Sequence, residues 1–151
     1  MTTIALIGCS KTKQPIDRMA WVPARELYTG DLFKKRVAHV ESRGLPWYIL
    51  SAGGGVIAPD VLVRTYDKTL SSMSDFEVAE WHAGVLVSLL DNLYYNHGQP
   101  PLKSVTFEIH AGKRYSQPLE QLLGVLGIKV VLPVKGLGIG EQLAYYGKVH
   151  A

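Results

Sequence analysis

Short apolar segments alternate with longer amphipathic ones along the chain. The apolar runs predict buried strands because they are short and rich in β-branched and aromatic side chains. The predicted strands cover residues 3–7, 47–50, 104–109 and 129–133, with a shorter one at 61–65, and the predicted helices cover 24–43, 75–95, 118–127 and 141–148. We expect a single α/β domain over residues 1–151, with three α/β/α layers around a central, mainly parallel sheet of about four or five strands.

Polar and glycine residues mark where the predicted helices begin and end. Ser74 and Glu77 have the spacing of a capping box, so a long helix is expected to follow them. Pro23 opens the first helix and Gly44 ends it. The basic run at residues 33–36 is interpreted as a solvated face of that first helix.

Each of the four main predicted strands runs directly into glycine and polar residues. Cys9, Ser51, His110 and Gly136 lie at or just after these strand ends. Ligands of open α/β sheets bind outside the carboxyl ends of the strands. The segments around residues 9, 52, 110 and 137 are therefore expected to converge on one shared hollow.

The composition and the net charge limit the kinds of protein and of site that the chain can form. Among 151 residues, 47% are hydrophobic and 19% are charged, which is typical of a globular protein. The net charge of +3 allows an anionic partner without requiring one. The single cysteine excludes an intrachain disulfide, and the scattered histidines predict no metal site and no cofactor. The first residues lack a basic leader and a signal-peptide core, so we expect a cytoplasmic protein without a membrane segment.

The segment Gly-Cys-Ser-Lys-Thr-Lys at residues 8–13 follows the first strand. Backbone N–H, hydroxyl and ammonium groups bind anions, so Ser10, Lys11 and Lys13 are predicted to hold a phosphate. The segment lacks the spacing of a P-loop. Cys9 is a candidate nucleophile because neighbouring lysines favour a thiolate. Its structural alternative is a small residue that closes a strand.

Aromatic and glycine residues are candidates for holding a base. Tyr28 can stack on a base or hydrogen-bond to it, and its alternative is a half-buried position on a helix. The three glycines after Ser51 allow a ligand to approach the backbone closely, and their alternative is a flexible connector. The residues expected to contact the substrate here are Tyr28, Ser51, Gly53, Gly54, Gly55, Tyr66 and Tyr115.

Two aspartates and one histidine are candidates for acid–base chemistry. Asp60 and Asp67 lie in irregular sequence, where a carboxylate can orient water or stabilise positive charge on a sugar. His110 can stabilise a departing base. The structural alternatives are turn aspartates and a satisfied polar histidine. Gly138 and Gln142 lie at the start of the last helix and are expected to contact the substrate, because the N–H groups at a helix start favour an anion. Packing of the last helix against the sheet explains the glycines of this segment equally well.

Five motifs in order resemble one protein family. They are Gly-Cys-Ser-Lys-Thr-Lys at residues 8–13, Ala-Arg-Glu-Leu-Tyr-Thr-Gly-Asp-Leu-Phe at 24–33, Tyr-Ile-Leu-Ser-Ala-Gly-Gly-Gly-Val at 48–56, Tyr-Asp-Lys-Thr-Leu at 66–70 and Gly-Leu-Gly-Ile-Gly-Glu-Gln-Leu at 136–143. Together they resemble the DUF6884 family of small phage and bacterial proteins. That family is similar to the YaaA-like peroxide-stress proteins and to the catalytic core of archaeosine synthase. The resemblance implies a uracil-DNA-glycosylase-like α/β fold and a nucleic-acid or modified-nucleobase substrate.

The chain departs from this family pattern at one loop. The resemblance predicts Ser-Ala-Lys followed by a bulky residue, but residues 51–56 read Ser-Ala-Gly-Gly-Gly-Val, so we expect a roomier loop. The water-activating aspartate motif of the glycosylase fold is also absent after the first strand, where Cys9, Ser10 and Lys11 stand instead.

The leading expectation is an enzyme that cleaves or remodels the N-glycosidic bond of a modified base in DNA or in a nucleotide, with a base flipped from DNA if the substrate is polymeric. Asp60 or Asp67 would orient water in that reaction. Two alternatives stay open. The first is a non-enzymatic module that binds DNA or a nucleotide, and the second is an enzyme in which Cys9 attacks an electrophilic base such as a nitrile.

Overall fold

The computed structural model describes residues 1–149 of the chain. Its strands are β1 (Thr2–Gly8), β2 (Val22–Pro23), β3 (Trp47–Ser51), β4 (Gly55–Ile57), β5 (Leu62–Val63), β6 (Val105–His110) and β7 (Lys129–Val131). Its helices are α1 (Ala24–Leu27), α2 (Asp31–Ser42), α3 (Asp75–Asn96), α4 (Lys113–Val125) and α5 (Ile139–Val149). Single 3₁₀ turns cover Leu70–Ser72 and Leu102–Ser104.

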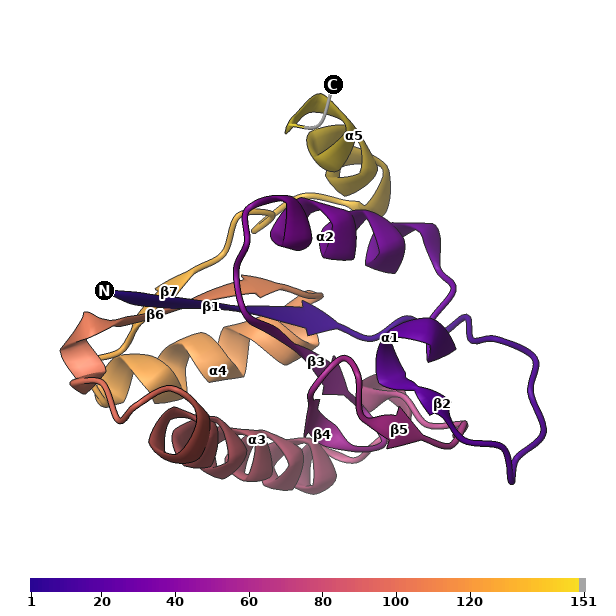
Figure 1. Cartoon of the computed structure of the whole chain (residues 1–151), viewed down its shortest axis with the longest axis horizontal. Helices are drawn as coiled ribbons and strands as arrows, with labels where there is room; N and C mark the ends of the chain where they lie inside the picture. The colour runs from indigo at the N-terminus through magenta and orange to yellow at the C-terminus, as the bar shows by residue number, and fades with distance from the viewer. Residues whose placement is uncertain (150–151) are drawn as a thin grey trace.

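Five strands form a central sheet in the order β4-β3-β1-β6-β7 (Figure 1). β1 pairs in parallel with both β3 and β6, and β7 continues the parallel arrangement on the outer side of β6. β4 alone runs antiparallel, because it returns from β3 through a tight glycine turn. The expected α/β class and the central, mainly parallel sheet are confirmed.

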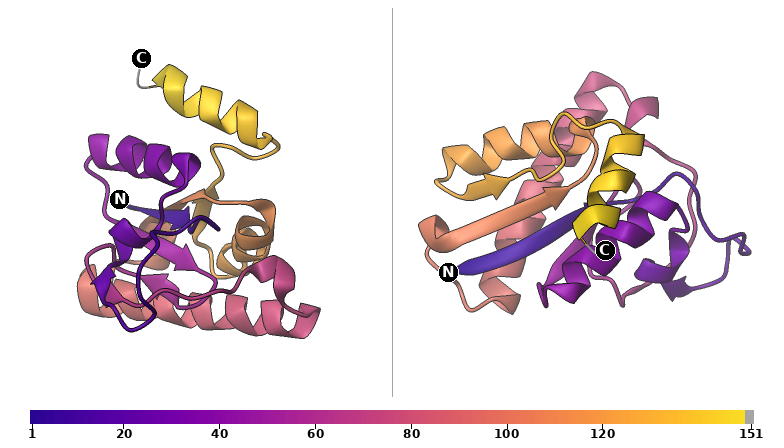
Figure 2. Two further views of the ribbon diagram at one scale, coloured as in Figure 1. Left: turned by 90° about the vertical axis from the view of Figure 1, so that its right-hand side faces the viewer. Right: turned by 90° about the horizontal axis from the view of Figure 1, so that it is seen from above.

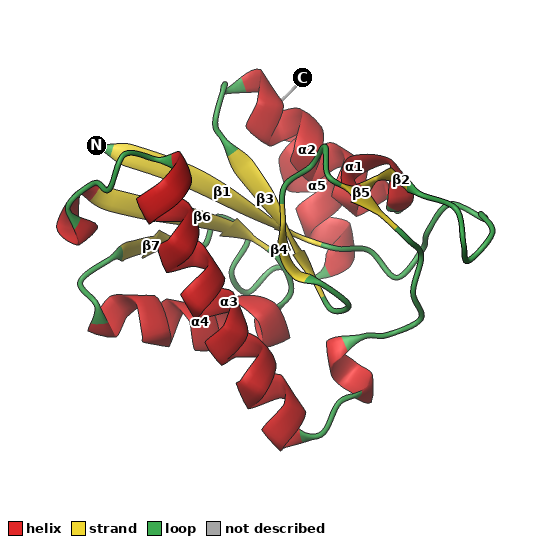
Figure 3. Cartoon of the chain, turned by 60° about the horizontal axis from the view of Figure 1, so that its bottom comes forward, coloured by secondary structure: helices red, strands yellow, loops and turns green. Residues whose placement is uncertain are grey.

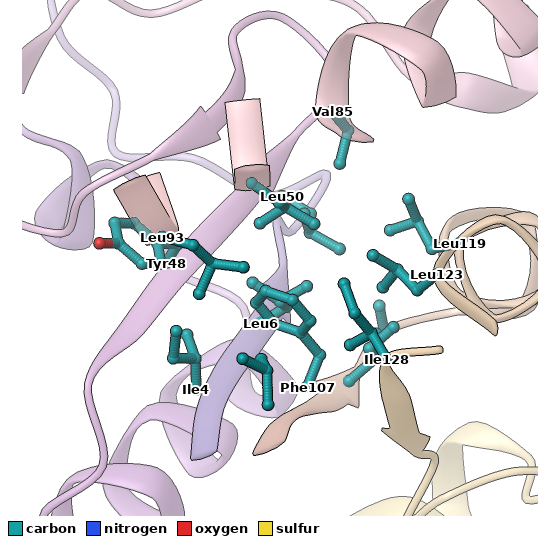
Figure 4. Packing of buried hydrophobic residues seen from close by; sticks show 14 residues of the cluster. Ile4, Leu6, Tyr48, Leu50, Val85, Leu93, Phe107, Leu119, Leu123 and Ile128 are labelled. Carbon is teal, nitrogen blue, oxygen red and sulfur yellow. The ribbon is translucent and has the colours of Figure 1, made fainter. Parts of the chain in front are cut away.

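Helices cover both faces of this sheet (Figures 1 and 3). On the face of α3 and α4, a buried cluster centres on Leu6 and Phe107, with Leu93 and Leu119 reaching it from the helices (Figure 4). On the opposite face, Ile7 and Ile49 pack with residues of α1 and α2. Strand alternation assigns the faces, since every second residue of β1 points the same way.

α5 lies on the same side of the sheet as α2 and is the more distant of the two from the strands (Figure 2). Its inner residue Tyr146 is fully buried. None of the helices formed by residues 1–149 combines the length and the apolar character needed to cross a lipid bilayer.

Some helices and strands begin or end at other residues than the sequence predicts, because tertiary contacts determine these boundaries. The helix predicted over 24–43 is split into α1 and α2, because Tyr28 is extended and forms a bridge with Lys13. α4 begins at Lys113, so Pro118 lies inside it and not at its start. The strand predicted over 61–65 shortens to β5, which pairs with β2 outside the main sheet. The capping box of Ser74 forms as predicted.

Gly8 is expected to be intolerant of any side chain. A Cβ built on Gly8 would lie 2.9 Å from the Cβ and 3.3 Å from the Cα of Ala111, a backbone atom that cannot move aside. We expect Gly8→Ala to lower the free energy of unfolding by about 1–3 kcal/mol through this overpacking. The matched control is Gly84→Ala in α3, where the added Cβ meets nothing within 4 Å. That change should raise stability by up to about 1 kcal/mol, and urea unfolding of both variants measures the contrast. Equal effects of the two changes would contradict the tight contact between β1 and Ala111.

Candidate functional site

The register of the sheet brings the predicted strand ends to one edge. Gly8 stands opposite Leu50, and Ile7 stands opposite His110. The N–H of Cys9 then donates to the carbonyl of Leu50 at 3.0 Å, so the chain leaves β1 directly beside the end of β3. The side chains at this edge form separate groups: a cluster of tyrosines around Cys9, a basic hollow beside it and a buried network around His110.

Cys9, Tyr28, Ser51, Tyr66 and Tyr115 form the first group, here called the tyrosine cluster. The Cys9 Sγ and the Tyr115 hydroxyl lie 3.4 Å apart. The hydroxyls of Tyr28 and Tyr66 lie 2.8 Å from each other. Cys9 is half-buried, so the thiol lies at the boundary between the core and the surface. The cluster therefore joins a thiol to four hydroxyl groups contributed by distant parts of the chain.

Ser51 is the centre of this cluster and is fully buried. Its Oγ accepts from the Tyr28 hydroxyl at 3.2 Å and donates to the Tyr66 hydroxyl at 2.9 Å. It also accepts from the N–H groups of Gly53 at 3.2 Å and Gly54 at 3.1 Å. Ser51 thus holds the glycine loop and two tyrosines in place.

Neighbouring side chains fill the space beside two of the three glycines in the loop after Ser51. A Cβ on Gly53 would lie 2.8 Å from the Tyr66 ring, and a Cβ on Gly54 would lie 2.7 Å from the Cδ1 of Ile57. Gly55 adopts a φ of 71°, which favours glycine. Tyr66 fills the space that a larger residue at position 53 would take.

The tyrosine hydroxyls are protonated donors at neutral pH. Burial raises the pKa of Tyr66 and of Tyr115 well above the ordinary value, and the neighbouring Cys9 acts in the same direction. Burial also raises the pKa of Tyr28. A hydroxyl that keeps its proton can donate to an adjacent thiolate or to negative charge that develops on a bound molecule.

A basic hollow of about 310 Å³ opens beside the tyrosine cluster. Lys11, Lys13 and Arg18 line it together with Tyr66 and Asp67. The Lys13 Nζ lies 4.5 Å from the centre of the Tyr66 ring, within the range of a cation–π contact. The structure thus brings together four predicted residues of the site and adds Arg18, which sequence reasoning missed in the polar loop before β2.

Ser10 is engaged in holding the loop and does not line this hollow. Its hydroxyl donates to the carbonyl of Thr12 and accepts from the N–H of Gly30 at 3.3 Å. Gly30 is required there because a Cβ would lie 2.9 Å from the Ser10 Cβ. Ser10 thus joins the loop to the start of α2, and its predicted phosphate contact stays a prediction.

Asp60 lies apart from the hollow. Its side chain is 83% exposed, and its nearest cation is Arg25, whose Nη1 is 3.9 Å away. Of the two predicted carboxylates, Asp67 alone lines the basic hollow. The structure therefore does not bring Asp60 together with the residues that line this hollow.

His110 belongs to a buried polar network and not to the substrate edge. It is fully buried, its Nε2 lies 2.7 Å from the Glu108 Oε1 and its Nδ1 lies 2.6 Å from the Tyr146 hydroxyl. Arg43 holds both oxygens of Glu108. The side chain of His110 lies on the α2 and α5 face of the sheet, so its predicted contact with a departing base is corrected.

The same network contains three groups of the kinds that bind metal ions. One donor atom each of His39, Glu108 and His110 lie within 4.8 Å of one another, and all three residues are buried. The guanidinium of Arg43 already neutralises Glu108, and His110 bonds to the same carboxylate. The arrangement fits an ion-paired structural network.

A second cavity, of about 430 Å³, lies between α4 and the segment after β7. Ala111, Lys113, Lys135 and Gln142 contribute to its walls. The N–H of Gly138 donates to Glu141 at 3.2 Å and caps the start of α5. The expectation of one shared hollow is therefore wrong. The strand ends share an edge, but the residues that follow them line two separate spaces.

Two more residues at this edge escaped the sequence analysis. The indole N–H of Trp81 donates to the carbonyl of Ser51 at 3.0 Å, and the Trp81 and Tyr115 rings lie 5.3 Å apart. Arg36 is buried although the basic run at residues 33–36 predicted a solvated face, whereas Lys34 and Lys35 are exposed as expected. Arg36 lies three residues after Phe33 and four before Val40, so helical spacing places it on their buried face, away from Lys34 and Lys35.

The buried network predicts a defined loss of stability in acid. Burial acts to raise the pKa of Glu108, but hydrogen bonds from His110 and Arg43 outweigh it and lower the pKa to about 2. Because this value lies below the ordinary 4.5, the stabilisation is complete above pH 4.5 and is lost as the pH falls toward 2. We expect Glu108→Gln to lower the free energy of unfolding by about 3 kcal/mol at neutral pH.

Urea unfolding at several pH values checks this expectation. The difference between wild type and Glu108→Gln should shrink steadily below pH 4.5. The exposed Glu26 provides the control, since Glu26→Gln removes the same charge from the surface and should change stability by less than about 0.5 kcal/mol. A difference between wild type and Glu108→Gln that stays constant across this pH range would contradict the ion-paired network.

Comparison with known proteins gives one match. A family model described as a family of unknown function, DUF6884, matches residues 4–148. No curated protein and no solved structure matches the chain. The matched range includes the tyrosine cluster, the basic hollow and the second cavity. The chain therefore belongs to the DUF6884 family.

Proposed function

We propose that the protein is an enzyme acting on a nucleobase, bound as part of a nucleotide or of DNA, at the carboxyl edge of β1 and β3. The observation that carries this proposal is the position of Tyr66. Its ring lines the basic hollow, and its hydroxyl belongs to the cluster that contains Cys9. A phosphate-binding surface and a nucleophile thus lie on two sides of one aromatic side chain.

The charges of the hollow suit a phosphate. Lys11, Lys13 and Arg18 supply three cations against the single carboxylate of Asp67. Lysine ammonium groups and guanidinium groups both bind phosphate oxygens. The Tyr66 ring beside them offers a face on which a base can stack. The proposed substrate therefore places its phosphate near the lysines and its base toward the tyrosine cluster.

The geometry favours Cys9 as the reacting group. The thiol lies 3.4 Å from the Tyr115 hydroxyl, which keeps its proton and can donate to a thiolate. On a base that carries a nitrile, the S–H of Cys9 adds across the C≡N bond. One S–C bond forms, one C–N π bond breaks and the nitrogen takes the thiol proton. The product is a covalent thioimidate that retains every atom of the base.

Asp67 supports a second reaction at the same hollow, the hydrolysis of an N-glycosidic bond. Its carboxylate lines the hollow and is exposed, so it can orient a water molecule toward the sugar. Of the three groups that the sequence suggested for this hydrolysis, Asp67 alone lines the hollow, since Asp60 and His110 lie elsewhere. It is the version closest to a DNA glycosylase.

The relationship to glycosylase-like folds and to more distant protein families is part of the same proposal. Helices on both faces of a parallel sheet are compatible with a uracil-DNA-glycosylase-like arrangement of three layers. The likeness to YaaA-like proteins and to archaeosine synthase rests on the motif at residues 8–13. A phage or bacterial origin and a cytoplasmic location are proposed on the same ground.

A substrate panel separates the two reactions. The wild-type protein is incubated with nucleoside 5′-monophosphates and DNA that carry modified bases, including nitriles. Intact-protein mass spectrometry detects a covalent adduct, and chromatography detects free base. We expect an adduct with the mass of the protein plus the substrate, absent in Cys9→Ser and retained in Asp67→Asn. Free base released by Cys9→Ser but not by Asp67→Asn would contradict the reaction at Cys9 and would support hydrolysis of the N-glycosidic bond with Asp67.

The salt dependence of binding tests the phosphate contact and separates an enzyme from a binding module. Replacing Lys11 and Lys13 by alanine should weaken nucleotide binding and reduce its dependence on salt concentration, because each phosphate contact releases counterions. Lys34 and Lys35 are the matched control, since they are exposed on α2, away from the hollow. Their replacement should leave the slope unchanged. Binding with the expected slope but without adduct or free base would overturn the enzymatic proposal.

A further inference from the structure

Arg36 is a buried cation without a carboxylate partner in the described part of the chain. Only 5% of the residue is exposed. Its Nη2 donates to the Gln142 Oε1 at 2.7 Å, and its buried Nε has no hydrogen-bond partner among residues 1–149. A guanidinium stays charged at neutral pH, and burying a charge without a counter-charge carries a large desolvation cost. The two side chains that the guanidinium contacts, Gln142 and Tyr146, are neutral, so the fold holds a positive charge in its interior without a counter-charge.

The guanidinium lies behind the wall of the second cavity. Gln142, which receives its hydrogen bond, lines that cavity. The Arg36 Nη1 lies 3.7 Å from the Cβ position of Gly8, and the same position is 2.9 Å from Ala111, another residue of the cavity wall. The guanidinium therefore lies next to Gln142 and close to Ala111, two residues of the cavity wall, with Gln142 between it and the cavity.

The cavity has further positive character. Gly112 stands at the N-terminus of α4, a helix of 13 residues that has no side-chain cap and no acidic residue in its first turn. Lys113 and Lys135 line the cavity as well. Glu120 is the one carboxylate among the lining residues, and it lies 3.9 Å from the Lys135 Nζ. Free N–H groups at a helix N-terminus, together with cations, favour a bound anion.

We propose that the second cavity binds the phosphate group of a small molecule and that Arg36 supplies the buried counter-charge. The Gln142 amide, which donates to the carbonyl of Leu137 at 2.9 Å, covers the guanidinium until it rotates and exposes it to the phosphate. A phosphate suits the site better than a carboxylate because Arg36, Lys113, Lys135 and the α4 N-terminus act together. The volume of about 430 Å³ accommodates a phosphorylated metabolite.

This site is separate from the basic hollow. No residue lines both spaces, and the proposed ligand of the cavity does not depend on any reaction at Cys9. A negative result at this cavity leaves the proposed nucleobase chemistry unaffected, and a negative result at Cys9 leaves this cavity unaffected.

The test is a titration with inorganic phosphate, with acetate as the carboxylate control. Nitrogen-15 NMR follows the N–H of Arg36 Nε and the backbone amides of Gly112 and Lys113. We expect phosphate to shift all three signals and to raise the melting temperature, and acetate to do neither. An Arg36 Nε–H signal that phosphate leaves in place would overturn the proposal, and an equal response to acetate would replace phosphate by a carboxylate ligand.

Variants separate binding from a structural role of Arg36. Arg36→Met keeps the side-chain length without the charge. It should abolish the phosphate-dependent rise in melting temperature while the phosphate-free protein stays at least as stable as wild type, because an unpaired buried charge has been removed. Persistence of the phosphate effect in Arg36→Met would contradict the assignment.

A second pair of variants decides the matter if Arg36→Met fails to fold. Lys113→Gln should weaken phosphate binding about tenfold, as expected for a charge at a helix N-terminus that contacts the ligand. Lys103→Gln is the matched control, because Lys103 is exposed next to the opposite end of β6. Equal weakening by both changes would show a general charge effect and would overturn the site.

Discussion

The parallel pairing of β1 with β3 on one side and with β6 on the other is the constraint on which the rest of the structure depends. It aligns Gly8 with the end of β3 and Ile7 with His110, so three strand ends leave the sheet together. Chain segments more than a hundred residues apart become neighbours there, as the contact between Cys9 and Tyr115 shows. Gly8 has no side chain because the end of β6 occupies the space beside it.

Polar groups at this edge follow the rule that a buried charge needs a partner. Glu108, His110 and Arg43 satisfy one another in a closed network beneath α5, which gives that network a structural role. Cys9 and the tyrosines form a partly open network next to exposed lysines, where a substrate can approach. Arg36 departs from the rule because its partners Gln142 and Tyr146 are neutral, and the proposed phosphate would supply the missing counter-charge.

Much of the fold follows from local sequence, because strand alternation and helix capping act over a few residues. The strands at 47–50 and 104–109 and the capping box of Ser74 appear within one or two residues of their predicted positions. Long-range packing decides the rest. The extended Tyr28 depends on pairing with Lys13, and the burial of Arg36 depends on α5, which comes about a hundred residues later. The sheet face on which His110 lies could have been predicted from the sequence, since strand alternation places it opposite Phe107 and Ile109.

A crystal structure of the protein with a nucleoside 5′-monophosphate tests the central claim most directly, because it locates the substrate relative to Tyr66 and Cys9. The account predicts a phosphate between Lys11, Lys13 and Arg18, with the base against Tyr66 and its edge directed toward the thiol. A nucleotide bound at the opposite, amino-terminal edge of the sheet, or with its base directed away from the tyrosine cluster, would contradict it.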